Sequence, residues 1–180
     1  MDKQIILSIL TPSIPERWQA LIDLQSQIQS QIGDDWPVEH LVFVDNRKRS
    51  IGRKRDGLMR LARGKYLTFV DDDDNISEDY VSEILSAAKE NPDVITFRQY
   101  AVVDGKNGTV EFKLSNVDEP FNPGRVTRRS AWHVCAWRTV LVEDERLARR
   151  DLARHLAAFP AIQIVGEATT AAEAERLLPE

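Results

Sequence analysis

The 180-residue sequence predicts an α/β protein in which helices cover both faces of a mostly parallel sheet. Two observations support this fold class. Apolar runs of strand length alternate along the chain with segments whose apolar residues recur every three or four positions, the order typical of parallel sheets. Hydrophobic residues make up 42% of the sequence, which is enough to fill the interfaces between such a sheet and its helices.

The first part of the chain alternates between predicted strands and helices. Apolar runs at 4–10 (QIILSIL), 40–44 (HLVFV) and 66–70 (YLTFV) predict three buried strands. Between the first two strands, residues 16–32 carry apolar side chains at helical spacing. Between the second and third strands we expect a basic helix, whose predicted buried face consists of Ile51, Leu58, Leu61 and Ala62.

The elements after the third strand continue this alternation and then change to β structure. Ser77 is expected to be the N-cap of a further helix, because two acidic residues would follow in its first turn. A strand is predicted at 93–97, and the turn sequence at 104–108 (DGKNG) predicts a β-hairpin.

Composition and charge argue against several classes of function. The net charge of −5 argues against a protein that binds nucleic acid through general polyanion affinity. No apolar run approaches the roughly 20 residues of a membrane-spanning helix, and the acidic start of the chain does not resemble a secretion signal. Cys135 is the only cysteine, so no internal disulfide can form. We therefore expect a cytoplasmic protein without a membrane span.

The composition changes sharply near residue 139, which predicts two regions of different origin. Residues 139–180 contain nine alanines, whereas the much longer region 1–138 contains seven. The second region has the pattern strand, helix, strand, helix, but about 40 residues cannot bury enough surface to fold alone. We therefore expect it to pack against the first region or to pair with a second copy in a homodimer.

Acidic residues gather where the predicted strands end. Four consecutive aspartates, residues 71–74, follow the third strand, and Asp45 follows the second. In open α/β sheets ligands bind beyond the carboxyl ends of the strands. Clustered carboxylates repel one another unless a cation neutralises them, and hard oxygen ligands suit Mg²⁺ or Mn²⁺. The alternative is an acidic loop and helix cap that is exposed to water.

Four segments in this order resemble the family 2 glycosyltransferases: ILTPSIPER, VFVDN, IGRKRDGLMRLARGKYLTFVDDDDN and AWHVCAWRT. In that family a segment like Arg-Asn-x-Gly precedes a strand that ends in a pattern like Leu-Asp-x-Asp-Asp. The resemblance covers residues 1–138 and implies the GT-A fold, which is Rossmann-like. It also implies a metal-dependent enzyme that moves a sugar from a nucleotide diphosphate sugar to a hydroxyl acceptor.

The resemblance also implies roles for individual residues. It places the nucleotide at Thr11, Pro12, Arg17, Asp45, Arg53 and Asp71. It places Mn²⁺ or Mg²⁺ at Asp71, Asp73 and Asp74. Asp45 would accept a hydrogen bond from the base, while Asp71 and Asp73 match the Asp-x-Asp signature that meets the ribose and the metal. Asp74 is a rival for the metal contact, because the run of four aspartates leaves the register open.

The resemblance ends near residue 138, before the usual position of the general base. Such an enzyme needs a base to deprotonate the acceptor, and Asp144 is the only nearby candidate. Residues 139–180 instead resemble the first βαβα unit of a LytTR-type response-regulator receiver domain, a flavodoxin-like fragment without the phosphoacceptor aspartate. We therefore expect a chimera, engineered or natural, in which sugar transfer is slow or absent. The alternatives are a chimera that binds nucleotide without turnover and a signalling module derived from a receiver.

Overall fold

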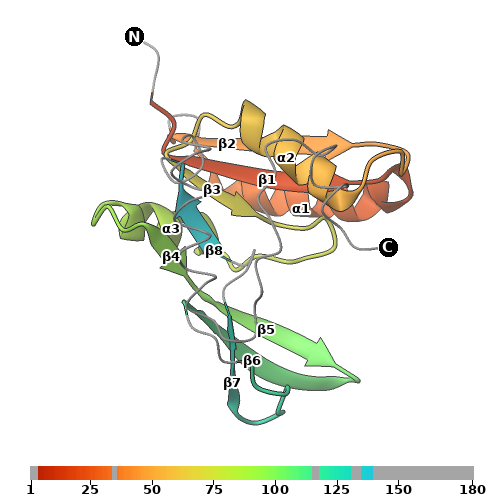
Figure 1. The fold of residues 1–180 in the computed structure, drawn as a ribbon, viewed down its shortest axis with the longest axis vertical. Helices are drawn as coiled ribbons and strands as arrows, with labels where there is room; N and C mark the ends of the chain where they lie inside the picture. The colour runs from red at the N-terminus through yellow and green to blue at the C-terminus, as the bar shows by residue number, and fades with distance from the viewer. Residues whose placement is uncertain (1–3, 34–35, 115–117, 131–134, 140–180) are drawn as a thin grey trace, which may run out of the picture. The chain divides into compact units, whose positions relative to one another are not determined.

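The computed structural model describes residues 4–33, 36–114, 118–130 and 135–139 (Figure 1). Internal contacts divide the chain into two units, and every described residue lies in the first, Met1–Thr139. The division falls next to the change in composition. The second region of the sequence, which includes Asp144, lies outside the described residues.

The described part of the chain alternates between strands and helices and then continues as strands. In chain order the first elements are β1 (Leu7–Ser13), η1 (Pro15–Arg17), α1 (Trp18–Gln31), β2 (Val38–Val44), α2 (Ile51–Leu61) and β3 (Tyr66–Phe69). The later elements are α3 (Tyr80–Ala88), β4 (Val94–Thr96), β5 (Arg98–Val103), β6 (Lys106–Lys113), β7 (Val126–Ser130) and β8 (Cys135–Arg138). This order confirms the α/β fold class. None of these helices is long and apolar enough to cross a membrane.

The larger sheet has the strand order β2-β1-β3-β8-β4 and is mixed. β1 pairs in parallel with β2 and β3, as predicted, whereas β8 lies antiparallel to both β3 and β4. The expectation of a mostly parallel sheet is therefore wrong for the part of the sheet formed by β3, β8 and β4. Parallel neighbours need a crossover connection, usually a helix, and the described residues between β4 and β8 form only strands, turns and loops.

Helices cover both faces of the larger sheet, which confirms this part of the prediction. On one face the core joins apolar side chains of α1, α3, β1 and β3, namely Leu7, Ile9, Leu24, Ile28, Tyr66, Val81 and Ile84. α2 packs on β1 and β2 from the other face (Figure 1). The three- and four-residue spacing of Leu21, Leu24 and Ile28, each at most 2% exposed, directs one face of α1 onto the sheet.

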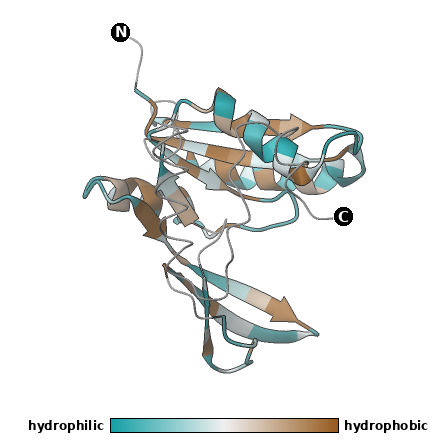
Figure 2. Ribbon diagram, viewed as in Figure 1, coloured by the Kyte–Doolittle hydropathy of each residue, from teal (hydrophilic) through white to brown (hydrophobic). Residues whose placement is uncertain are grey.

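The predicted buried face of α2 is right for Leu58 but wrong for Ile51 and Leu61. Ile51 and Leu61 are 53% and 66% exposed, whereas Lys54 and Leu58 are 5% and 1% exposed. Figure 2 shows this helix as largely hydrophilic. Because Lys54 lies one helical turn before Leu58, its side chain follows the buried face of the helix toward the sheet.

α3 begins later than predicted, at Tyr80, and Ser77 is not its N-cap. The carbonyl of Ser77 instead accepts hydrogen bonds from the Tyr80 N–H at 3.1 Å and from the Gln31 side-chain amide at 2.8 Å. The oxygen of the same Gln31 amide accepts a hydrogen bond from the Val81 N–H at 3.0 Å. A glutamine of α1 thus supplies the cap that the prediction gave to Ser77.

β5, β6 and β7 form a second, three-stranded sheet. β5 and β6 are antiparallel and are joined at Asp104 and Gly105, which both have positive φ angles. This turn confirms the predicted hairpin. β7 pairs with β6 in parallel. A single residue, Phe97, separates β4 of the larger sheet from β5 of the smaller one.

Candidate functional site

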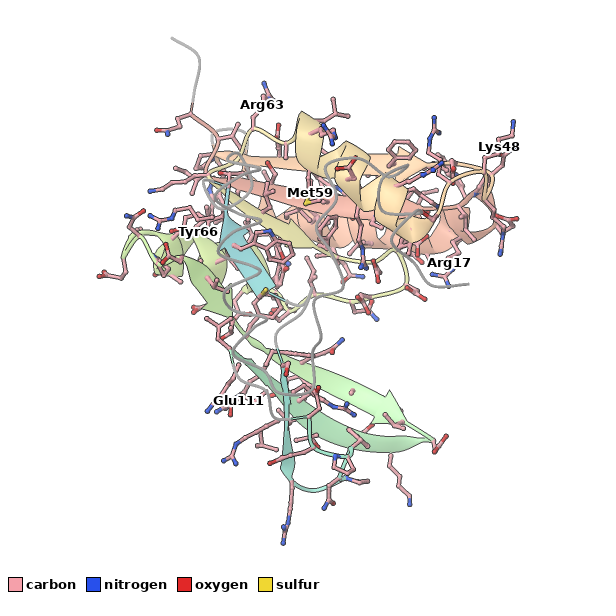
Figure 3. All side chains as sticks on the ribbon, viewed as in Figure 1. Arg17, Lys48, Met59, Arg63, Tyr66 and Glu111 are labelled. Atoms are coloured by element: carbon pink, nitrogen blue, oxygen red, sulfur yellow. The ribbon has the colours of Figure 1, made fainter. Side chains whose placement is uncertain are left out.

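Polar side chains converge where β1, β2 and β3 end. The three strands are adjacent and parallel, so their carboxyl ends lie at one edge of the larger sheet. Ser13 ends β1, Asp45 follows β2, and Asp71 comes soon after β3. Figure 3 labels Arg17 at this edge and Arg63 near the opposite one. The structure thus brings together the strand ends on which the sequence placed a site.

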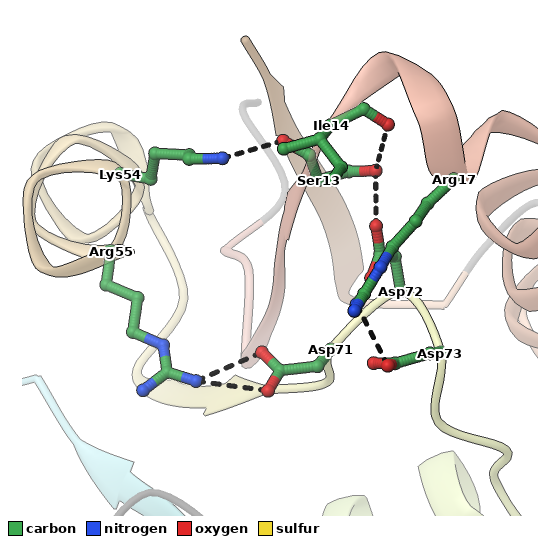
Figure 4. A network of polar contacts seen from close by, with 8 residues as sticks. All are labelled: Ser13, Ile14, Arg17, Lys54, Arg55, Asp71, Asp72 and Asp73. Atoms are coloured by element: carbon green, nitrogen blue, oxygen red, sulfur yellow. Dashed lines mark hydrogen bonds and ion pairs between the residues drawn. The ribbon is translucent and has the colours of Figure 1, made fainter. Parts of the chain in front are cut away.

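Asp72 lies within a polar network at this edge (Figure 4). Its side chain is only 2% exposed. The Ser13 hydroxyl donates to Asp72 Oδ2 at 2.6 Å, and Arg17 Nη1 donates to Asp72 Oδ1 at 2.8 Å. The same Arg17 nitrogen lies 2.9 Å from Asp73 Oδ2. One guanidinium nitrogen therefore bridges two carboxylates, and the hydrogen bond to Asp72 together with both negative charges raises the pKa of Arg17.

Asp71 forms a separate ion pair with an arginine of α2. Arg55 Nη2 lies 3.0 and 3.2 Å from the two carboxylate oxygens of Asp71. The Arg55 guanidinium also lies over the ring of Phe69, 5.2 Å from the ring centre. Arg55 Nε is buried and has no hydrogen-bond partner.

Asp45 and Lys54 form a buried ion pair at the end of β2. Their side chains are 7% and 6% exposed, and Lys54 Nζ lies 3.0 Å from Asp45 Oδ1. Lys54 Nζ also donates to the Ser13 carbonyl at 2.9 Å, while Asp45 Oδ2 accepts from the Arg49 N–H at 2.9 Å. The neighbouring Lys54 lowers the pKa of Asp45, so this carboxylate is charged at neutral pH. Asp45 Oδ1 is itself buried, and the Lys54 ammonium group is its charged partner.

Thr11 and Pro12 lie inside β1, although the sequence placed them in a loop after the first strand. β1 pairs with β2 as far as Ser13 and is therefore longer at its carboxyl end than predicted. Thr11 is fully buried, and its hydroxyl lies 2.9 Å from His40 Nε2. Burial lowers the pKa of His40 to about 4, so this histidine is neutral at pH 7. The Thr11 side chain thus belongs to the interior of the sheet rather than to an open pocket wall.

Arg53, Asp74 and Asp144 complete the predicted set. Arg53 is exposed on α2, and its backbone N–H donates to the Ser50 hydroxyl that caps this helix. Asp74 is exposed, and its N–H donates to the Asp71 carbonyl in a turn. Asp144 lies outside the described residues.

Sequence reasoning missed Asp72, Lys54 and Arg55. In a run of four aspartates an Asp-x-Asp pattern fits two registers, and burial in the folded structure distinguishes Asp72 from its neighbours. Lys54 and Arg55 are two of nine basic residues between positions 47 and 65. The spacing of Lys54 and Leu58 was the signal that could have placed this lysine on the buried face of the helix.

The donor set at this edge suits a hard divalent cation but does not enclose one. Carboxylate oxygens are the ligands that Mg²⁺ and Mn²⁺ prefer, and the Arg17 nitrogen already holds a cationic position between Asp72 and Asp73. In the described part of the chain, no three acidic, histidine or cysteine side chains are grouped closely enough to hold a metal. Mg²⁺ usually binds through one or two carboxylates together with substrate phosphates. The residues therefore fit a metal that arrives with such a ligand.

Comparison with known proteins assigns the family. The family model described as Glycosyl transferase family 2 matches residues 19–150. The chain belongs to this family. Enzymes of this glycosyltransferase family often use divalent metals. No curated protein gives a significant match, and the receiver resemblance of residues 139–180 remains a prediction.

Solved structures of S. aureus TarS share the fold of this glycosyltransferase chain. The structure of TarS 1–349 in complex with UDP has 15% sequence identity and a TM-score of 0.53, and the match covers 78% of this chain and 48% of that chain. The complex of the same fragment with UDP-GlcNAc has 13% identity, a TM-score of 0.51 and coverage of 78% and 47%. The structure titled TarS alone has 14% identity, a TM-score of 0.53 and coverage of 79% and 30%.

At these identities the likeness shows the fold alone. The glycosyltransferase chain spans less than half the length of each of these three structures, because the matches cover 48%, 47% and 30% of them.

Proposed function

We propose that this chain binds a nucleotide diphosphate sugar at the carboxyl edge of β1, β2 and β3 and derives from an enzyme that transfers the sugar to a hydroxyl acceptor. The observation that carries the proposal is the polar network at this edge, in which Lys54 and the Arg49 N–H hold the charged Asp45 carboxylate in place. Membership of the glycosyltransferase family supports the substrate class. TarS has been solved with UDP and with UDP-GlcNAc, so uridine nucleotides are the first candidates here.

Asp45 is the proposed acceptor for an N–H group of the nucleotide base. Lys54 holds the carboxylate from one side and the Arg49 N–H holds it from the other. A ligand that meets a carboxylate already fixed in this way does not have to immobilise it on binding. The low pKa of Asp45 keeps it charged, so it acts as an acceptor alone at neutral pH.

Arg17 of η1 and Arg55 of α2 are the proposed ligands of the diphosphate, and Arg53, also on α2, is a further candidate. A guanidinium presents a planar fork of donors that matches phosphate oxygens. Asp71 and Asp73, with Asp74 as the rival, are the proposed ligands of Mn²⁺ or Mg²⁺. When bound, such a metal would neutralise the negative charge that develops on the diphosphate leaving group.

Asp144 is the proposed base for the hydroxyl acceptor, and we expect transfer to be slow. General acid–base catalysis is typically worth about 10² to 10⁴ in rate, and the motifs typical of the family stop near residue 138, although the family model extends to residue 150. The test is release of UDP from UDP-GlcNAc with Mn²⁺ and a panel of hydroxyl acceptors, for the wild type and for Asp144→Asn. We expect weak release that falls further in the variant. Fast release that survives Asp144→Asn would show that the base lies elsewhere.

A second candidate function is nucleotide binding without turnover. The composition break near residue 139 favours it, because a replaced C-terminal region would lack the catalytic base. Binding of UDP with no release of UDP from the sugar nucleotide would support this candidate. A signalling role derived from a receiver would instead require a stable aspartyl phosphate after treatment with acetyl phosphate, which mass spectrometry of the intact chain would detect.

A further inference from the structure

We propose that Arg17 is the resident cation of the Asp72–Asp73 pair and that a divalent metal replaces it only when a bound diphosphate draws the guanidinium away. Because Arg17 belongs to the nucleotide site described above, this role rests on the proposed function. It keeps Asp73 as a metal ligand and makes Asp72 its partner, in place of the Asp71 taken from the Asp-x-Asp signature. Arg17 would then do more than contact the nucleotide. It would compete with the metal for the two carboxylates and so couple metal binding to nucleotide binding.

The geometry of the Arg17 contacts supports a competition with metal. A single atom, Arg17 Nη1, lies 2.8 Å from Asp72 Oδ1 and 2.9 Å from Asp73 Oδ2. Figure 4 shows the guanidinium lying between the two carboxylates. A metal ion held by both carboxylates would need the same space, and the positive charges of the two groups would repel each other.

The burial of Asp72 explains why this position needs a cation. Asp72 is 2% exposed, and the Ser13 hydroxyl gives it one short hydrogen bond but no charge. An ionised carboxylate in the interior is strongly unfavourable without a counter-charge. The position therefore keeps a cationic partner, which is Arg17 in the absence of metal.

Arg17 is also placed so that it can leave. Its side chain is 47% exposed and projects from the short η1 helix. Asp73, its second partner, is 55% exposed. A diphosphate offers the guanidinium several oxygens in the same bidentate geometry as carboxylates. Departure of Arg17 would uncover two hard ligands beside the phosphates, which supply the further oxygens that this edge lacks.

Arg60 provides a comparison outside the network. It pairs with Asp56 at 3.0 Å on α2, and the two side chains are 68% and 53% exposed. Water can therefore solvate the charge of Asp56 if the arginine is removed. Loss of Arg60 should create much less demand for a replacement cation than loss of Arg17.

The test is a titration of Mn²⁺ monitored by the electron paramagnetic resonance signal of the free ion. Wild type, Arg17→Gln and Arg60→Gln are compared without nucleotide. We expect Arg17→Gln to bind Mn²⁺ at least about tenfold more tightly than the wild type, since one nearby opposite charge typically changes proton binding to a carboxylate by about 1–3 pKa units. Arg60→Gln should stay within about twofold of the wild type. Asp73→Asn in the Arg17→Gln background should remove the gain.

A second titration measures the coupling to nucleotide. UDP should tighten Mn²⁺ binding by the wild type about tenfold, after correction for the complex that Mn²⁺ and UDP form in solution. In Arg17→Gln the same nucleotide should tighten it by about twofold or less, because the carboxylates are already free. If Arg17→Gln is too unstable for titration, its thermal midpoint is followed instead, and Mn²⁺ should raise it more than it raises that of the wild type.

Three outcomes would overturn the inference. They are an unchanged Mn²⁺ affinity or thermal response in Arg17→Gln, an equal gain in Arg60→Gln, and UDP that binds the wild type without tightening Mn²⁺ binding. The last result would leave the proposed function intact, because nucleotide still binds. A fourth result would separate the two parts of the inference. If Arg17→Gln gains Mn²⁺ affinity but no variant binds UDP, the competition between Arg17 and the metal is supported. The proposed function, and with it the coupling of metal binding to nucleotide binding, is then refuted.

Discussion

Asp72 and Arg17 form an ion pair whose two ends lie in different environments. Asp72 is 2% exposed, whereas Arg17 is 47% exposed. Removing the exposed partner leaves a charge in the interior, and removing the buried partner leaves an arginine that water can solvate. The two changes should therefore differ in their effect on stability, although they break the same contact.

We predict that Arg17→Met lowers the free energy of unfolding by about 3 kcal/mol, near the lower end for breaking a buried ion pair. Asp72→Asn should cost only about 1 kcal/mol, because it removes the buried charge and keeps the shape. Urea unfolding at pH 7 in metal-free buffer measures both values. Equal losses, or a larger loss for Asp72→Asn, would mean that the charge of Asp72 does not depend on Arg17.

The buried environment of His40 should make the stability of the protein depend on pH. Burial lowers its pKa from 6.5 to about 4 in the folded protein. Between these values the unfolded chain binds a proton that the folded chain does not, so stability falls as the pH is lowered from 6.5 toward 4. The loss should reach about 1–2 kcal/mol by pH 5, which is above the range in which the carboxylates protonate.

His40→Gln should keep a hydrogen bond to Thr11 and remove this titration. Urea unfolding between pH 7 and pH 5 should therefore show a flatter dependence in the variant than in the wild type. The comparison isolates His40, because the other histidines are present in both proteins. Identical slopes would show that His40 titrates normally in the folded state.

At the level of elements, α1 fixes the start of α3 through a side chain. Gln31 accepts from the Val81 N–H and donates to the Ser77 carbonyl. We predict that Gln31→Ala lowers the free energy of unfolding by about 1–2 kcal/mol, the usual range for loss of a helix cap. Gln29, which is exposed on the same helix, is the matched control. Urea unfolding should place Gln29→Ala within about 0.5 kcal/mol of the wild type, and similar losses in both variants would argue against the cap.

The periodicity of the sequence was sufficient to predict six elements in type and order, namely β1, α1, β2, α2, β3 and α3, whereas the short η1 was not predicted. The helix at 16–32 corresponds to α1, and the apolar run at 66–70 corresponds to β3. The spacing of apolar residues in each element reports which of its own faces is buried, so it can be read without knowing the neighbouring elements. The insertion of β8 between β3 and β4 was not predictable in this way, because strand order depends on pairings far apart in the chain.

The face of α2 shows a different limit of sequence reasoning. Ile51 and Leu61 are apolar and were expected inside, but the helix buries Lys54 beside Leu58. The lysine is buried because Asp45 and the Ser13 carbonyl lie within reach of its ammonium group. A partner on another strand is a tertiary feature, and hydrophobicity alone assigns a lysine to the surface.

For the whole molecule, the place of the site was more predictable than its contacts. The parallel order of β1, β2 and β3 brings their carboxyl ends together, so the positions of Asp45 and Asp71 followed from the fold class. Which aspartate is buried and which cation faces it depend on side-chain packing. The sequence therefore indicated the edge and the residue types, while Asp72, Lys54 and Arg55 emerged only from the structure.

The central claim is that a nucleoside diphosphate binds at this edge through Asp45. Isothermal titration of UDP, with and without Mn²⁺, tests it most directly in the wild type, Asp45→Ala and the control Asp56→Ala, an exposed aspartate of α2 that pairs with Arg60. We predict that Asp45→Ala weakens UDP binding about tenfold or more in both conditions, since a hydrogen bond to a charged group is worth about 1.5–3 kcal/mol. Asp56→Ala should bind UDP like the wild type. A folded wild type that binds no nucleoside diphosphate, or an Asp45→Ala protein that binds UDP as tightly as the wild type, would contradict the claim.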